Sequence, residues 1–132
     1  MSTPKYDLVM LIDDNELDNF VNKKMIEVES FAGATTIHPS AVSALEYLKK
    51  NEGAPELIPG LIFLDIMMPE MDGFGFLDAF DKLADAVKAK SKIVMLSTSD
   101  SFKDLNRANQ NKHVKRFLNK PLSAQVLSAL NI

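Results

Sequence analysis

The sequence predicts an α/β fold in which a five-stranded parallel sheet is covered by helices on both faces. Five short apolar segments alternate along the chain with segments whose apolar residues recur every three or four positions. This alternation is typical of parallel sheets, because each parallel connection needs a crossover that is usually a helix. The clearest runs, residues 8–12, 61–64 and 93–96, contain no polar residue, which indicates strands buried on both faces.

Composition narrows the class of protein. The chain has 132 residues, of which 46% are apolar and 25% charged, so we expect residues 1–132 to form one globular domain. The net charge of -3 argues against a nucleic-acid surface built on global positive charge. No apolar stretch approaches the roughly 20 residues of a membrane span, and the N-terminus lacks the apolar core of a signal peptide. We therefore expect a cytoplasmic protein without membrane insertion or direct nucleic-acid binding.

The first strand and helix surround a pair of acids. Residues 6–12 form a strand candidate that stops at Asp13 and Asp14. A helix is expected from Asn15, with its polar face outward and an apolar stripe toward the core. The stripe consists of Leu17, Phe20, Val21, Lys24, Met25 and Val28.

The second strand and helix are followed by a loop. Residues 34–37 can form a strand, which Pro39 ends. Ser40 is a good N-cap for the next helix, whose apolar residues are Ala41, Val42, Leu45 and Leu48. Residues 51–60 contain two glycines and two prolines and predict a loop.

A third strand, residues 61–65, delivers a single acid, Asp65, at its end. Placing an acid at the end of a buried strand costs free energy, unless a cation stabilises its charge or the acid has a chemical role. After a loop that closes at Gly73, one helix is expected to run to about Lys90. Its apolar residues are Phe74, Phe76, Leu77, Phe80, Leu83, Ala84 and Val87.

The last two strands also end in polar residues. Residues 92–96 lead into three hydroxyl residues, 97–99, and Asp100 or Ser101 could cap a weak fourth helix that runs toward Asn111. Residues 114–118 form the fifth strand, which leads to Lys120 and a short last helix. The stripe of that helix is Leu122, Val126, Leu127 and Leu130.

The polar strand ends suggest phosphoryl transfer. In a doubly wound sheet, ligands bind at the carboxyl ends of the strands, so these groups should meet. Three carboxylates there would repel each other unless a cation joins them, and Mg²⁺ suits such a set. A lysine can pair with a phosphoryl group, a hydroxyl can donate to it, and an aspartate can act as its acceptor. The groups concerned are Asp13, Asp14, Asp65, Ser97, Thr98 and Lys120.

This ordered set resembles the receiver domain of two-component response regulators over essentially the whole chain. The matching pieces are Asp13-Asp14, Asp65 with Met68-Pro69 and Met71-Asp72-Gly73, Ser97, and Lys120-Pro121. The resemblance implies a flavodoxin-like doubly wound sheet of strand order 2-1-3-4-5 with five helices.

The resemblance also implies a role for each acid. Asp65 would be the phosphoacceptor. Asp14 would bind Mg²⁺ directly, and Asp13 would help through a water or by holding Lys120. The backbone carbonyl of Met67 would complete the protein's share of the metal shell.

Three further residues would form a switch. Ser97 would turn toward the phosphoryl group, which Lys120 would also bind. Phe117 holds the aromatic position that moves inward with that hydroxyl, although it lacks the hydroxyl of the tyrosine common in the family. Thr98 is larger than the residue often found there and could narrow access to Asp65.

The implied function is a receiver without an output domain. It would take phosphate from a histidine kinase or a phosphotransfer protein, and it would then switch the binding of a partner or pass the phosphate onward. It would not be an enzyme beyond assisting its own phosphorylation and dephosphorylation.

Three other functions fit the sequence less well. A metal-dependent phosphohydrolase with an Asp nucleophile commonly needs a second acid two residues later, where this chain has Met67. A flavin or nucleotide binder needs a phosphate-cradling loop after the first strand, whereas Asp13 and Asp14 would repel phosphate. A pseudo-receiver that only mediates protein contacts would not need the intact acidic set.

Overall fold

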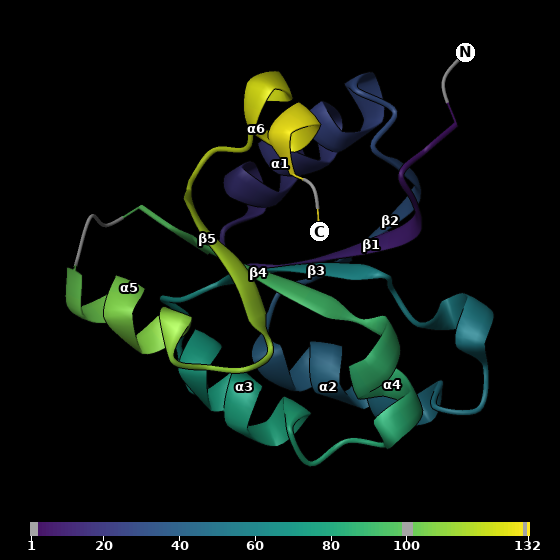
Figure 1. Ribbon diagram of the computed structural model, residues 1–132, viewed down its shortest axis with the longest axis vertical. Helices are drawn as coiled ribbons and strands as arrows, with labels where there is room; N and C mark the ends of the chain where they lie inside the picture. Colours follow the sequence, from purple (N-terminus) through teal and green to yellow (C-terminus); the bar gives the residue numbers. More distant parts are fainter. Residues whose placement is uncertain (1–2, 99–101, 131) are drawn as a thin grey trace.

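The computed structural model, which describes residues 3–98, 102–130 and 132, is built on one five-stranded parallel sheet (Figure 1). Its strands lie in the order β2-β1-β3-β4-β5, and all neighbours pair in parallel. The fold class and the strand order are therefore confirmed. The strands are β1 (Tyr6–Ile12), β2 (Ala32–His38), β3 (Leu61–Asp65), β4 (Lys92–Ser97) and β5 (Val114–Asn119).

Helices cover both faces of the sheet. Helices α1 and α6 lie on one face, and α2, α3, α4 and α5 lie on the other (Figure 1). The cap expected at Asp100 or Ser101 falls outside the described residues. Within the described residues the helices are α1 (Glu16–Val28), α2 (Ala41–Lys50), the short 3₁₀ helix η1 (Pro55–Leu57), α3 (Gly73–Phe80), α4 (Asp85–Lys90), α5 (Phe102–Asn109) and α6 (Ala124–Ala129).

The central strands supply two hydrophobic cores, one on each face. In β3, Ile62 and Leu64 belong to the core shared with α2 and α3, whereas Leu61 and Phe63 belong to the core shared with α1 and α6. This division follows from the alternation of side chains along a strand. All five residues of β3 are buried, so the strand that ends in Asp65 is held from both sides.

The chain forms two helices after Gly73, where the sequence predicts one. Helix α3 ends at Phe80 and α4 begins at Asp85, and Ala84 between them has a non-helical backbone close to polyproline II (φ -56°, ψ 144°). Leu83 remains buried in the same core as Phe80. The apolar spacing is satisfied on both sides of this turn, so periodicity alone cannot reveal the break.

Most of the apolar stripe of α1 faces outward, which contradicts the prediction that it packs on the core. Of its apolar members, Met25 is the one that is half-buried against the core. The buried residues of α1 are instead Asn19, Asn22 and Ile26. Both asparagines bind backbone groups that need hydrogen-bond partners, the carbonyl of Asp13 and the N–H of Leu122. Polar side chains therefore suit the inward face. The exposed apolar side chains, here called the α1 apolar face, are Leu17, Phe20, Val21 and Val28.

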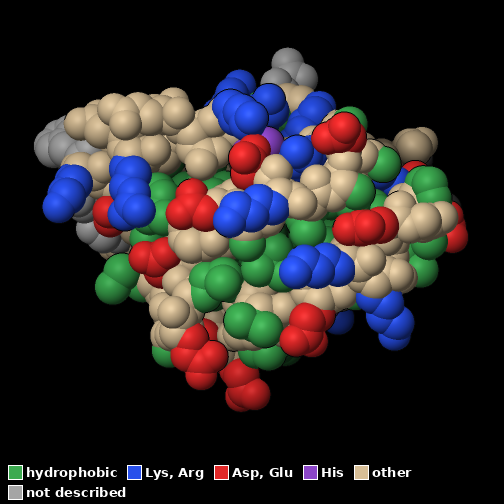
Figure 2. Space-filling model, turned by 90° about the horizontal axis from the view of Figure 1, so that it is seen from below, with side chains coloured by type: hydrophobic (Ala, Val, Ile, Leu, Met, Phe, Trp, Pro, Cys, Tyr) green, Lys and Arg blue, Asp and Glu red, His purple; other side chains and the backbone are tan. Residues whose placement is uncertain are grey.

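The surface over α2, α3 and α4 carries acidic and basic side chains interspersed with hydrophobic ones (Figure 2). Among the described residues, none of the helices has the length and apolar character needed to cross a bilayer.

Gly73 lets the first turn of α3 approach the backbone of β3, which yields a stability prediction. A Cβ at this position would lie 2.8 Å from the carbonyl oxygen of Asp65 and 3.0 Å from Cα of Ile66. We expect Gly73→Ala to lower the free energy of unfolding by about 1–3 kcal/mol, because backbone must move. Chemical denaturation measures the change.

Gly53 offers the matched control. A Cβ there would meet nothing within 4 Å, so Gly53→Ala should leave stability unchanged or raise it by up to about 1 kcal/mol. Equal stabilities of the two variants would contradict the account of Gly73.

Candidate functional site

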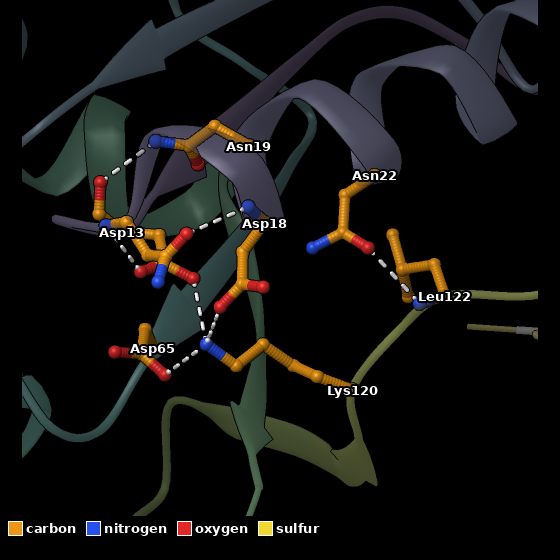
Figure 3. A network of polar contacts seen from close by, with 8 residues as sticks. Asp13, Asp18, Asn19, Asn22, Asp65, Lys120 and Leu122 are labelled. Carbon is orange, nitrogen blue, oxygen red and sulfur yellow. Dashed lines mark hydrogen bonds and ion pairs between the residues drawn. The ribbon is translucent and has the colours of Figure 1, made fainter.

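Side chains from three strand ends meet at the carboxyl edge of the sheet (Figure 3). Asp13 follows β1, Asp65 ends β3 and Lys120 follows β5. The Nζ atom of Lys120 lies 2.8 Å from Oδ2 of Asp13 and 3.1 Å from Oδ1 of Asp65. The three side chains are 7% exposed or less, so the ammonium and both carboxylates form a buried ion cluster.

Helix α1 holds Asp13 in place. The side-chain amide of Asn19 donates to the backbone carbonyl of Asp13 at 2.7 Å, and the backbone N–H of Asn15 donates to Oδ1 of Asp13 at 3.0 Å. The backbone N–H of Asp13 donates in turn to the carbonyl of His38 at the end of β2. The carboxylate that faces Lys120 is thus held by the start of α1 and by the end of β2.

Lys120 is positioned by contacts on either side of it. Its backbone N–H donates to the carbonyl of Ser97 at 2.9 Å, which joins the ends of β4 and β5. Two residues later, the N–H of Leu122 donates to Oδ1 of Asn22 at 3.0 Å (Figure 3). The ammonium therefore reaches the acids from a backbone tied both to the sheet and to α1.

The acids form a set that could hold a metal ion. Asp13, Asp14 and Asp65 each offer a carboxylate oxygen, and these oxygens lie within 4.8 Å of one another. Asp14 is exposed, which leaves room for waters and for substrate oxygens. Hard oxygen ligands with open positions are what Mg²⁺ prefers, so the residues fit this ion. The role of the Met67 carbonyl stays a prediction, and the side chain of Met67 is 71% exposed.

The surroundings shift the ionisation of both central groups. Burial, together with the negative charge of Asp13, raises the pKa of Asp65 to about 6, against the opposing effect of Lys120. Burial alone would lower the pKa of Lys120, but hydrogen bonds from its ammonium to Asp13, Asp18 and Asp65 outweigh it and raise the pKa. Lys120 is therefore a permanent cation, whereas Asp65 is a carboxylate that a nearby cation can help to keep ionised.

Asp18 is a member of the site that the sequence reasoning missed. Its Oδ2 lies 2.7 Å from Nζ of Lys120, the shortest of the three contacts of the ammonium. Asp18 lies in the first turn of α1, shortly after the strand end that carries Asp13 and Asp14. This closeness along the chain could have revealed it, but the assumption that Leu17 and Phe20 face the core turns the side chain of Asp18 away from Lys120.

The residues expected to form the switch lie in β4, in β5 or directly after β4, and their environments differ. Ser97 ends β4 and is 2% exposed, and the following Thr98 is exposed. Phe117 pairs with Met95 across β4 and β5 and is half-buried against the core shared with α2 and α3. Their motions upon phosphorylation stay predictions.

The chain is similar to known signalling proteins over most of its length. The family model for the response regulator receiver domain matches residues 9–130. The probable methanogenesis regulatory protein FilR2 of Methanothrix harundinacea is 32% identical over 120 residues, which cover 91% of this chain and 76% of that protein. The two-component response regulator ORR1 of Oryza sativa subsp. japonica is 29% identical over 124 residues, which cover 92% of this chain and 52% of that protein.

A solved structure has the same overall fold. The crystal structure of a two component response regulator from Cytophaga hutchinsonii matches with a TM-score of 0.87 and 30% sequence identity. The match covers 93% of this chain and 92% of that one, so the likeness extends over nearly the whole fold.

The raised pKa of Asp65 predicts that the metal-free protein becomes less stable as the pH rises from about 4 to above 6. Its folded-state pKa of about 6 lies above the ordinary 3.8, so the folded chain carries an unfavourable charge above pH 6 that is relieved as the pH falls toward 4. Asp65→Asn removes this charge. We expect the variant to be more stable at pH 7 by on the order of 1 kcal/mol, allowing for solvent screening, and the advantage to shrink by about pH 4.5.

Urea unfolding of both proteins in EDTA measures this difference. Burial lowers the pKa of His38, which gives the opposite pH trend, but His38 is common to both proteins and cancels in the comparison. A stability difference that is constant from pH 7 to about 4.5 would mean that Asp65 has an ordinary pKa.

Proposed function

The chain belongs to the response regulator receiver family, and from this premise we propose that it accepts a phosphoryl group on Asp65 from a histidine kinase or a phosphotransfer protein. One observation carries the proposal. The buried carboxylate at the end of β3 is one of three clustered acids that suit Mg²⁺, and it lies 3.1 Å from the ammonium of Lys120.

In the proposed reaction, a carboxylate oxygen of Asp65 attacks the phosphorus atom of the donor. The bond from phosphorus to the donor atom breaks, and its electron pair leaves with the donor, which takes up a proton. Lys120 and the hydroxyl of Ser97 stabilise the charge on the transferring oxygens. Mg²⁺, when bound by Asp13, Asp14 and Asp65, would supply further positive charge to those oxygens.

The output would be a change in partner binding or a relay of the phosphate. Phosphorylation adds negative charge beside Lys120, whose backbone follows β5. Movement of Ser97 and Phe117 would then bias β5 and α5 between two arrangements. Because a histidine kinase obtains its phosphate from ATP, this reaction belongs in the cytoplasm.

The chain would act on no other substrate. A phosphohydrolase with an Asp nucleophile remains the alternative, but its usual second acid has no counterpart at the exposed Met67. Only the protein's own aspartyl phosphate would be hydrolysed.

Asp65→Asn tests the phosphoacceptor. Incubation of wild type with acetyl phosphate and Mg²⁺ should add one phosphoryl group to the intact protein, as read by mass spectrometry. The variant should remain unmodified, because an amide is too weak a nucleophile. Omission of Mg²⁺ should abolish or strongly slow labelling of the wild type.

Asp7→Asn is the matched control, since Asp7 is exposed near the opposite end of β1. It should be labelled like the wild type. Labelling of Asp65→Asn at the wild-type level would refute the proposal, and steady release of phosphate from added phosphate esters would favour the hydrolase.

We propose that the protein phosphodonor docks on the α1 apolar face. Phe20 is 67% exposed and lines a groove of about 470 Å³ with Ile37 and Pro39. Asn19, which holds Asp13, lines the same groove, so the groove adjoins the acidic site. Exposed apolar surface of this kind commonly marks a protein contact.

Phe20→Ala separates donor docking from chemistry. Transfer from a phosphorylated histidine phosphotransfer protein should slow by roughly tenfold, as expected for loss of a buried aromatic contact. Labelling by acetyl phosphate should not change, because the small donor needs no docking surface. Equal slowing with both donors would show that Phe20 acts on the site itself.

A further inference from the structure

The ammonium of Lys120 is fully engaged. A lysine has three donors, and Nζ contacts three carboxylates: Asp13 at 2.8 Å, Asp18 at 2.7 Å and Asp65 at 3.1 Å (Figure 3). A phosphoryl group on Asp65 that is to accept a hydrogen bond from Lys120 must therefore replace one of these contacts.

Asp18 is the partner that can be replaced most easily. The side chain of Asp13 is 5% exposed and that of Asp65 is 6% exposed, whereas that of Asp18 is 34% exposed. A carboxylate released from Lys120 can be solvated by water only if it is accessible, and a buried one would be left unpaired. Asp18 also lies outside the three-acid cluster that could hold the metal, so its release leaves that cluster intact.

The charge of the phosphoryl group also favours the release of Asp18 from Lys120. The phosphoryl group brings added negative charge to the position that Lys120 faces. Asp18 lies 2.7 Å from the same ammonium, so its carboxylate and the phosphoryl oxygens would repel each other across it.

We propose that Asp18 is a positioning residue that holds Lys120 in the unphosphorylated state and competes with the phosphoryl group for its ammonium. This inference rests on the proposed function. Asp18 thereby sets how readily the site accepts and keeps a phosphoryl group, without contacting the transferring phosphorus itself.

Beryllium fluoride, which binds an aspartate as a phosphoryl analogue, provides the test. In Asp18→Asn, calorimetric titration in saturating Mg²⁺ should show beryllium fluoride binding roughly three- to tenfold tighter than in wild type, since a competing charge is gone. A separate titration should show Mg²⁺ affinity within about twofold of wild type. A merely structural defect in the variant would weaken the binding of both beryllium fluoride and Mg²⁺.

Two control variants complete the test. Glu16→Gln removes one charge from the same first turn of α1 and should change neither affinity. Asp18→Glu restores the carboxylate and should bind beryllium fluoride like the wild type. Unchanged or weaker binding by Asp18→Asn, or equal tightening in Glu16→Gln, would overturn the inference. Failure of the wild type to bind beryllium fluoride would instead overturn the proposed function and this inference with it.

Discussion

The ammonium of Lys120 balances the negative charge that the fold concentrates at one edge of the sheet. Asp13 and Asp65 reach this edge because parallel strands end on the same side, and two buried carboxylates would repel each other without a cation. Lys120 comes from the far side of β4, so its ion pairs also tie the edge strand β5 to the centre of the sheet. The stability of the sheet and the proposed chemistry therefore depend on the same contacts of Lys120.

The rigidity of the strands differs across the site. β3 is buried at every position and holds Asp65 firmly, whereas β5 is an edge strand whose residues are half-buried or exposed. In the proposed switch, a change of charge beside Lys120 would therefore act on the part of the sheet that is least constrained by packing. That asymmetry suits a switch, because a fixed acceptor can bias a movable neighbour.

Much of the fold could be read from the sequence because strands buried on both faces leave uninterrupted apolar runs. The acids and the lysine could be located because strand ends converge in any doubly wound sheet. The orientation of α1 could not, because periodicity turns the apolar stripe inward, whereas the inward face carries Asn19 and Asn22, which bind the backbone of Asp13 and Leu122. Asp18 was missed for the same reason, and the turn at Ala84 was missed because it preserves the apolar spacing.

The central claim is that Asp65 becomes an acyl phosphate. Its most direct test is to treat the acetyl phosphate-labelled protein with borohydride, which reduces an acyl phosphate to an alcohol, and to map the product by peptide mass spectrometry. The account predicts homoserine at position 65 and unmodified Asp13, Asp14 and Asp18. Reduction at another acid, or none in a protein that carries phosphate, would contradict it.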